Sequence, residues 1–118
     1  METKDFKKKF MKASPDIDRS LTFNRIVRRD IKRLGETMCN IIAMEELSEL
    51  QKEVSKKIRN KKEDNYDLLQ EIADVLICIG CLTQEYNISS DDVNKALNVK
   101  LERIEEKNKE YFSKFEEI

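Results

Sequence analysis

Apolar side chains recur every three or four positions along most of the chain, which is the spacing of one face of an α-helix. The clearest run predicts a helix over residues 36–58. A second run, the most apolar in the chain, predicts a helix over residues 66–86. The segment between them, residues 59–65, is entirely polar and short. We therefore expect these two helices to pack antiparallel across a loop.

Further helices are expected on either side of this pair. Residues 1–13 form a short, basic, amphipathic segment that ends before Pro15, and a helix is predicted over residues 21–34. The last helix is expected to begin at Ser89 or Ser90, because serine caps helix N-termini, and to run almost to the C-terminus. These patterns predict an all-α fold, a helical bundle with short connections.

Composition supports this fold class and limits the partners. The 118 residues fit a single domain, 40% of them are charged, and there are only two glycines and one proline, which favours helix. The formal net charge is −1 with both signs interleaved, so nucleic acid is not an expected partner. Because so small and charged a domain often buries apolar surface against a second copy, we expect a homo-oligomer.

The three cysteines bear on location and on chemistry. An odd count, together with a charged N-terminal stretch that lacks an apolar segment, favours a reducing cytoplasmic setting. No apolar run approaches the length that spans a bilayer, so no membrane partner is expected. Cys78 and Cys81 form a C-x-x-C, but a redox or zinc site needs further features that are absent, and packing inside an apolar helix is the preferred interpretation.

Two acidic pairs flank the apolar stripes of the two central helices. Glu46 and Glu49 are three residues apart, as are Glu71 and Asp74, and Glu45 lies four residues before Glu49. Side chains at these spacings share a helix face, so antiparallel packing would bring the pairs together. Converging carboxylates repel unless a cation lies between them, and an all-oxygen set suits Mg²⁺ or Mn²⁺. Because the chain is so highly charged, the alternative is that these acidic residues are ordinary solvent-exposed side chains and bind no metal.

The two acidic segments also carry a family resemblance. "EELSEL", then "EIADVL", then "KLERI" in the last helix resemble the all-α nucleoside triphosphate pyrophosphohydrolase superfamily, the MazG-like group, whose signature is E-E-x-x-E, a spacer and E-x-x-D. The resemblance covers roughly residues 38–108. It implies a MazG-like helical bundle completed by a partner chain in a homodimer or tetramer. It also implies Mg²⁺-dependent hydrolysis of (deoxy)nucleoside triphosphates to monophosphate and pyrophosphate, a reaction that serves nucleotide-pool house-cleaning.

The resemblance also implies roles for individual residues. Glu45 is either a further metal ligand or the group that orients the attacking water, so five acidic residues are candidates for catalysis. In the last helix Lys100 and Arg103 match phosphate contacts, with Lys95 and Asn98 as weaker candidates. The metal ligands carried over from the signature are Glu46, Glu49, Glu71 and Asp74.

The resemblance divides the chain and leaves two alternatives open. Residues 1–35 have no counterpart in the family pattern and are taken as an N-terminal helical extension that caps the site or enlarges an oligomer interface. Residues 36–118 are taken as the pyrophosphohydrolase core. The alternatives are an enzyme similar to phosphoribosyl-ATP pyrophosphohydrolase and a non-catalytic helical interaction or regulatory module with purely surface acidic positions.

Overall fold

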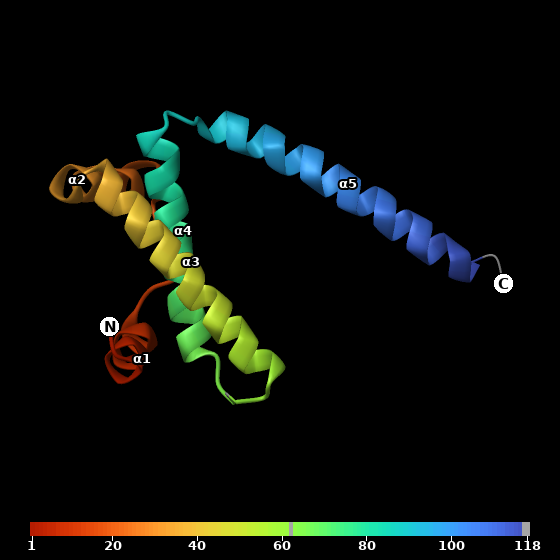
Figure 1. The fold of residues 1–118 in the computed structure, drawn as a ribbon, viewed down its shortest axis with the longest axis horizontal. Coiled ribbons are helices and arrows are strands. Elements are labelled where there is room, and N and C mark those ends of the chain that lie inside the picture. Colours follow the sequence, from red (N-terminus) through yellow and green to blue (C-terminus); the bar gives the residue numbers. More distant parts are fainter. Residues whose placement is uncertain (62, 117–118) are drawn as a thin grey trace. The chain divides into compact units, whose positions relative to one another are not determined.

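The computed structural model describes residues 1–61 and 63–116, and every regular element within them is helical (Figure 1). This confirms the predicted all-α class. The chain divides into two compact units, Met1–Tyr86 and Asn87–Ile118. The elements are α1 (Thr3–Lys12), the π-helical turn η1 (Arg19–Phe23), α2 (Asn24–Leu34), α3 (Glu36–Ile58), α4 (Tyr66–Glu85) and α5 (Ser90–Glu116).

The centre of the first unit is the antiparallel pair α3 and α4 (Figure 1). At the loop end, Lys57 Nζ donates to the carbonyl oxygen of Asp64 at 2.6 Å. At the opposite end, Asn40 Nδ2 donates to the hydroxyl of Tyr86 at 2.9 Å. The buried apolar side chains of these two helices are small. They are Cys39 and Ala43 on α3 and Val75, Cys78 and Cys81 on α4.

Helix α2 covers the C-terminal half of α4 and buries Val27, which is 2% exposed. Gly80 of α4 makes this contact possible, because a Cβ at that position would lie 2.6 Å from Cε1 of Phe23. The π-helical turn that carries Phe23 was not predicted from the sequence. It is stabilised by Asp18, whose side chain accepts the Leu21 N–H at 3.1 Å and whose carbonyl accepts the Phe23 N–H at 3.0 Å.

Gly35 separates α2 from α3. Its φ of 85° lies in the left-handed region that glycine tolerates, and its N–H donates to the Ile31 carbonyl at 2.8 Å, which closes the end of α2. Asn60 ends α3 in a similar way, with a φ of 55°. Both sharp changes of direction therefore fall on residues whose backbone permits them.

Helix α3 has apolar side chains around most of its circumference, whereas its packing on α4 covers only one side. Leu47 follows the buried Ala43 by one helical turn, yet it is 51% exposed. Leu50 is half-buried. Other large apolar side chains of the pair are also exposed, among them Ile41, Met44, Ile72, Leu76 and Ile79. The first unit thus presents apolar surface that its own helices leave uncovered.

The second unit consists of α5 and the residues that lead into it. Ser89 caps the helix as predicted, because its Oγ accepts the N–H of Asp92 at 3.1 Å. Near the C-terminal end, the ring of Tyr111 makes edge contacts with Phe112 and Phe115 at centroid distances of 5.1 and 5.2 Å. Among the described residues, no helix is both long and apolar enough to cross a membrane.

Candidate metal centre

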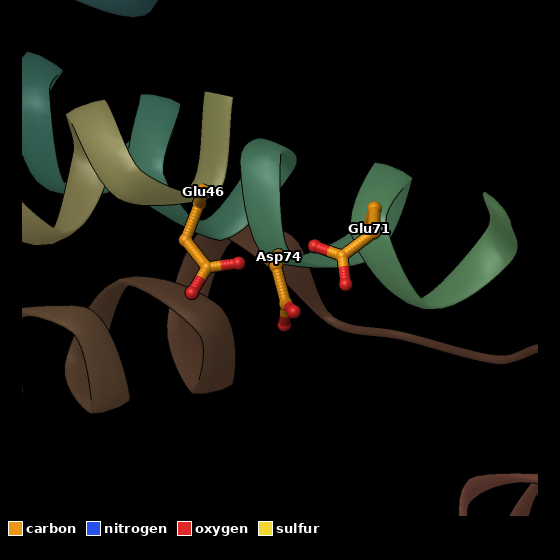
Figure 2. A group of neighbouring side chains, drawn as sticks. All are labelled: Glu46, Glu71 and Asp74. Carbon is orange, nitrogen blue, oxygen red and sulfur yellow. The ribbon is translucent and has the colours of Figure 1, made fainter. Parts of the chain in front are cut away.

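Three acidic side chains converge where α3 crosses α4. Glu46 projects from α3, and Glu71 and Asp74 project from neighbouring turns of α4, so that all three carboxylates lie on one side of the helix pair (Figure 2). One oxygen from each residue lies within 4.8 Å of one oxygen of each of the others. We call Glu46, Glu71 and Asp74 the carboxylate trio. The i, i+3 spacing of Glu71 and Asp74 and the antiparallel packing of α3 on α4 together create it.

The trio is half-buried, and this raises the cost of its negative charge. Burial first, and then the charges of Asp74 and Glu71, raise the pKa of Glu46 to about 7 from its ordinary value of 4.5. Burial and the charge of Asp74 also raise the pKa of Glu71. Three carboxylates held this close therefore favour a bound proton near neutral pH, and a cation could replace that proton.

The donor atoms of the trio fit a hard divalent cation. All of them are carboxylate oxygens, which suit Mg²⁺ or Mn²⁺ better than Zn²⁺. Oε2 of Glu71 is buried and has no hydrogen-bond partner in the described part of the chain. A buried carboxylate oxygen without a donor is costly, and a metal ion would satisfy it.

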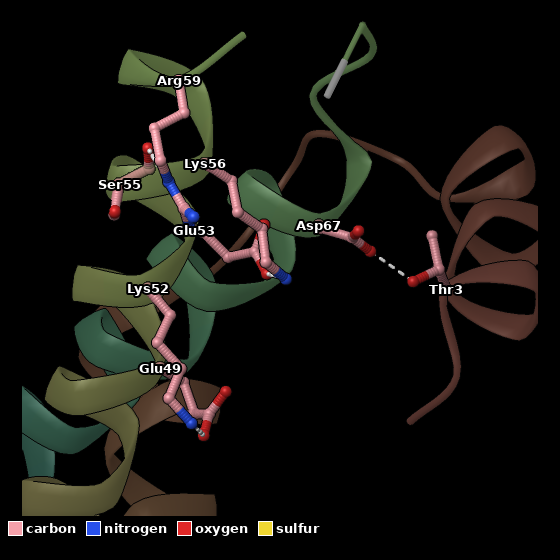
Figure 3. A network of polar contacts seen from close by, with 8 residues as sticks. All are labelled: Thr3, Glu49, Lys52, Glu53, Ser55, Lys56, Arg59 and Asp67. Atoms are coloured by element: carbon pink, nitrogen blue, oxygen red, sulfur yellow. Dashed lines mark hydrogen bonds and ion pairs between the residues drawn. The ribbon is translucent and has the colours of Figure 1, made fainter. Parts of the chain in front are cut away.

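The other two acidic candidates lie beside the trio on α3. Glu49 is exposed and its Oε1 pairs with Lys52 Nζ at 3.2 Å, one turn along the same helix (Figure 3). Its charge still reaches the trio, because it is one of the causes that raise the pKa of Glu71. Glu45 is exposed on the adjoining helix face. The structure thus brings three of the four predicted ligands together and places Glu49 nearby, in a surface ion pair.

Sequence reasoning missed a fourth carboxylate close to the trio. Glu53 of α3 is only 8% exposed, and its Oε1 pairs with Lys56 Nζ at 2.9 Å (Figure 3). Its negative charge also contributes to the raised pKa of Glu71. The signal was available, since Glu53 follows Glu49 by four residues and so extends the same acidic face.

The candidate phosphate contacts belong to the second unit. Lys95, Asn98, Lys100 and Arg103 are all exposed on α5. Lys100 and Arg103 are three residues apart and share a helix face, as the sequence predicted. These four residues belong to a different unit from the trio, and their substrate contacts stay predictions.

The C-x-x-C residues of α4 lie in the packed interface of the first unit. Cys78 and Cys81 are buried free thiols, as is Cys39 on α3. Burial raises the pKa of each thiol, and those of Cys78 and Cys81 reach about 11. These positions therefore behave as small packing residues.

Comparison with protein families connects this geometry to a known group. The family model described as the MazG nucleotide pyrophosphohydrolase domain matches residues 35–108. This range contains the whole carboxylate trio and most of α5, whereas α1 and α2 both lie outside it. Comparisons with curated proteins and with solved structures returned no match. Since the family model covers well over half of the chain, the chain belongs to the MazG nucleotide pyrophosphohydrolase domain family.

Proposed function

We propose that this chain hydrolyses (deoxy)nucleoside triphosphates to the monophosphate and pyrophosphate in a Mg²⁺-dependent reaction, with Mn²⁺ as a possible substitute. The observation that carries the proposal is the convergence of Glu46, Glu71 and Asp74 inside the segment that matches the family. The raised pKa of Glu46 supports it, because crowded carboxylates of this kind are typical of sites that bind cations.

The trio would hold the metal through carboxylate oxygens, and Glu49 would join it by giving up its exposed pair with Lys52. That exchange costs little, since an exposed pair is worth about 0–1 kcal/mol. When bound, Mg²⁺ supplies Lewis acidity and activation of water. Glu45, one residue before the trio member on α3, is suited to accept a hydrogen bond from the attacking water and so to orient it.

Cations on α5 would bind the phosphates. Lys100 and Arg103 are exposed on one face and can neutralise negative charge that develops as the α–β phosphoanhydride breaks, while Lys95 and Asn98 are weaker candidates. The chain has no histidine, so a histidine-based acid–base pair is unavailable to it. Its contribution to the rate is therefore expected to come from positioning and electrostatic stabilisation.

Self-association belongs to the same proposal. The apolar side chains exposed on the first unit, such as Ile41, Met44 and Ile72, are suited to bury against a second copy in a homodimer or tetramer. Sedimentation over a concentration range tests this expectation, and a chain that stays monomeric at micromolar concentration would contradict it. The free thiols are consistent with a reducing, cytoplasmic setting.

Product analysis tests the reaction. Purified protein is incubated with a panel of nucleoside and deoxynucleoside triphosphates and with phosphoribosyl-ATP, in Mg²⁺ and in EDTA, and the nucleotides are separated. Metal-dependent release of monophosphate and pyrophosphate supports the proposal and ranks the substrates, including surplus or non-canonical nucleotides expected in house-cleaning. Diphosphate with orthophosphate, or turnover in EDTA, would contradict it.

A further inference from the structure

Helix α1 lies outside the segment that matches the family, yet it contacts α4 immediately before the carboxylate trio. Thr3 Oγ1 donates a hydrogen bond to Oδ1 of Asp67 (Figure 3). Gln70 Nε2 donates to the carbonyl oxygen of Met1 at 2.9 Å. Asp67 lies one turn before Glu71 on the same helix face, and Gln70 immediately precedes Glu71 in the chain. Both hydrogen bonds therefore hold the part of α4 that carries Glu71.

A second group of contacts holds Tyr66, the first residue of α4. The ring of Phe10 packs edge-on against it at a centroid distance of 5.8 Å. Lys7 Nζ lies 4.9 Å from the centroid of the Tyr66 ring, a cation–π geometry. The Tyr66 hydroxyl donates to Sδ of Met11 at 3.8 Å. Polar and aromatic contacts from α1 and the Met1 carbonyl thus reach the first two turns of α4.

The N-terminus of α4 is weakly capped, so contacts from outside the helix would stabilise it. The side chain of Asn65, at the N-cap position, makes no capping hydrogen bond, and the Tyr66 N–H donates to Asp64 Oδ1 over a long 3.3 Å. Asp67, Glu71 and Asp74 also share one face, where like charges one turn apart repel. Helix ends fray when they lack such support, and fraying here would move Glu71. Helix α1 carries five lysines, and one of them, Lys7, contacts α4 at the Tyr66 ring.

We propose that α1 is a brace for the metal centre, which fixes the first two turns of α4 so that Glu71 is held beside Glu46 and Asp74. Thr3 and Tyr66 are then positioning residues, which touch neither metal nor substrate. The inference rests on the proposed role of the trio as metal ligands. It assigns the N-terminal extension a function within the first unit.

Two measurements on the full-length chain test the brace. The first is Mn²⁺ affinity by titration calorimetry, and the second is amide hydrogen exchange along α4. The Thr3→Val variant removes the hydroxyl donor at nearly constant volume, and Thr3→Ser keeps the donor as the matched control. We expect Thr3→Val to weaken Mn²⁺ binding about tenfold, the loss of one hydrogen bond to a charged group. Amides of residues 68–74 should exchange faster while those of 76–84 stay protected, and Thr3→Ser should match the wild type.

Two outcomes would overturn the brace. If Thr3→Val leaves both the Mn²⁺ affinity and the amide hydrogen exchange of α4 unchanged, then the contact of α1 with α4 does not position Glu71. Faster exchange across all of α3 and α4 would mean general destabilisation instead of local positioning. Tyr66→Phe, which keeps the ring beside Phe10 and loses only the hydroxyl, should retain affinity, whereas Tyr66→Ala should lose it. A wild-type chain that binds no Mn²⁺ contradicts the metal centre itself, and the exchange data then still decide whether Thr3 holds α4.

Discussion

A carboxylate oxygen of Glu46 on α3 lies within 4.8 Å of one on Asp74 of α4, although the two residues are separated by a complete helix–loop–helix connection. Two such groups repel in the absence of a proton or cation, and the charge of Asp74 is the second cause, after burial, of the raised pKa of Glu46. The repulsion between Glu46 and Asp74 therefore destabilises the metal-free protein, and a bound metal ion would relieve this repulsion.

Removing one carboxylate of this pair should lower the affinity for metal but raise the stability of the metal-free protein. We expect Asp74→Asn to weaken Mn²⁺ binding at least tenfold and to raise the free energy of unfolding of the metal-free protein at pH 8 by on the order of 1 kcal/mol, a figure that allows for solvent screening. Titration calorimetry and urea unfolding measure the two effects. Glu110→Gln on α5 is the control, since it removes a charge outside the matched family segment. A variant that binds Mn²⁺ as well as the wild type would remove Asp74 from the site.

The metal-free protein should lose stability as the pH rises from about 4.5 to 7. In this window folded Glu46, with its pKa of about 7, retains a proton that the unfolded chain, with a pKa near 4.5, has released. The folded state then binds more protons, so the free energy of unfolding falls with pH and levels off above 7. Urea unfolding in EDTA at a series of pH values measures the slope. Glu46→Gln should flatten it, and an unchanged slope in that variant would assign the effect to another group.

The helix pattern could be read from the sequence to within a few residues, because the apolar periodicity, the polar 59–65 loop and Ser89 are local signals. The approach of Glu46 to Glu71 and Asp74 also followed, since the short loop implied antiparallel packing, whereas the exposed ion pair of Glu49 with Lys52 did not. The exposure of Leu47 did not follow, because periodicity cannot distinguish a side chain that packs within the chain from one left for a partner. Nor could the contacts of α1 with Tyr66 and Asp67 be predicted, since they join residues far apart in the sequence.

The close approach of η1 to α4 should make Gly80 and Phe23 energetically coupled. A methyl group at position 80 would lie 2.6 Å from Cε1 of the Phe23 ring, so the ring must move. In the Phe23→Leu background we expect Gly80→Ala to stabilise the protein by about 1 kcal/mol through helix propensity. In the wild-type background the same change should be less favourable by about 1 kcal/mol or more. A double-mutant cycle by thermal or urea unfolding measures the coupling, and additive effects would show that the contact is not formed in solution.

The three cysteines should be unreactive while the protein is folded. With pKa values of about 11 for Cys78 and Cys81, only about one thiol in a thousand is ionised at pH 8. A thiol reagent such as iodoacetamide should label the native protein slowly, and mass spectrometry should find three labels once urea has unfolded it. Rapid native labelling of Cys78 or Cys81 would instead support a redox role for the C-x-x-C.

The central claim is that the carboxylate trio is the metal centre of a nucleotide pyrophosphohydrolase. The most direct test measures pyrophosphate release from the preferred nucleoside triphosphate in Mg²⁺, by wild type, Asp74→Asn and the Glu110→Gln control. We predict metal-dependent release by wild type and control, and a loss of at least a hundredfold in Asp74→Asn, whose fold is checked by circular dichroism. Equal release by all three proteins would contradict the claim.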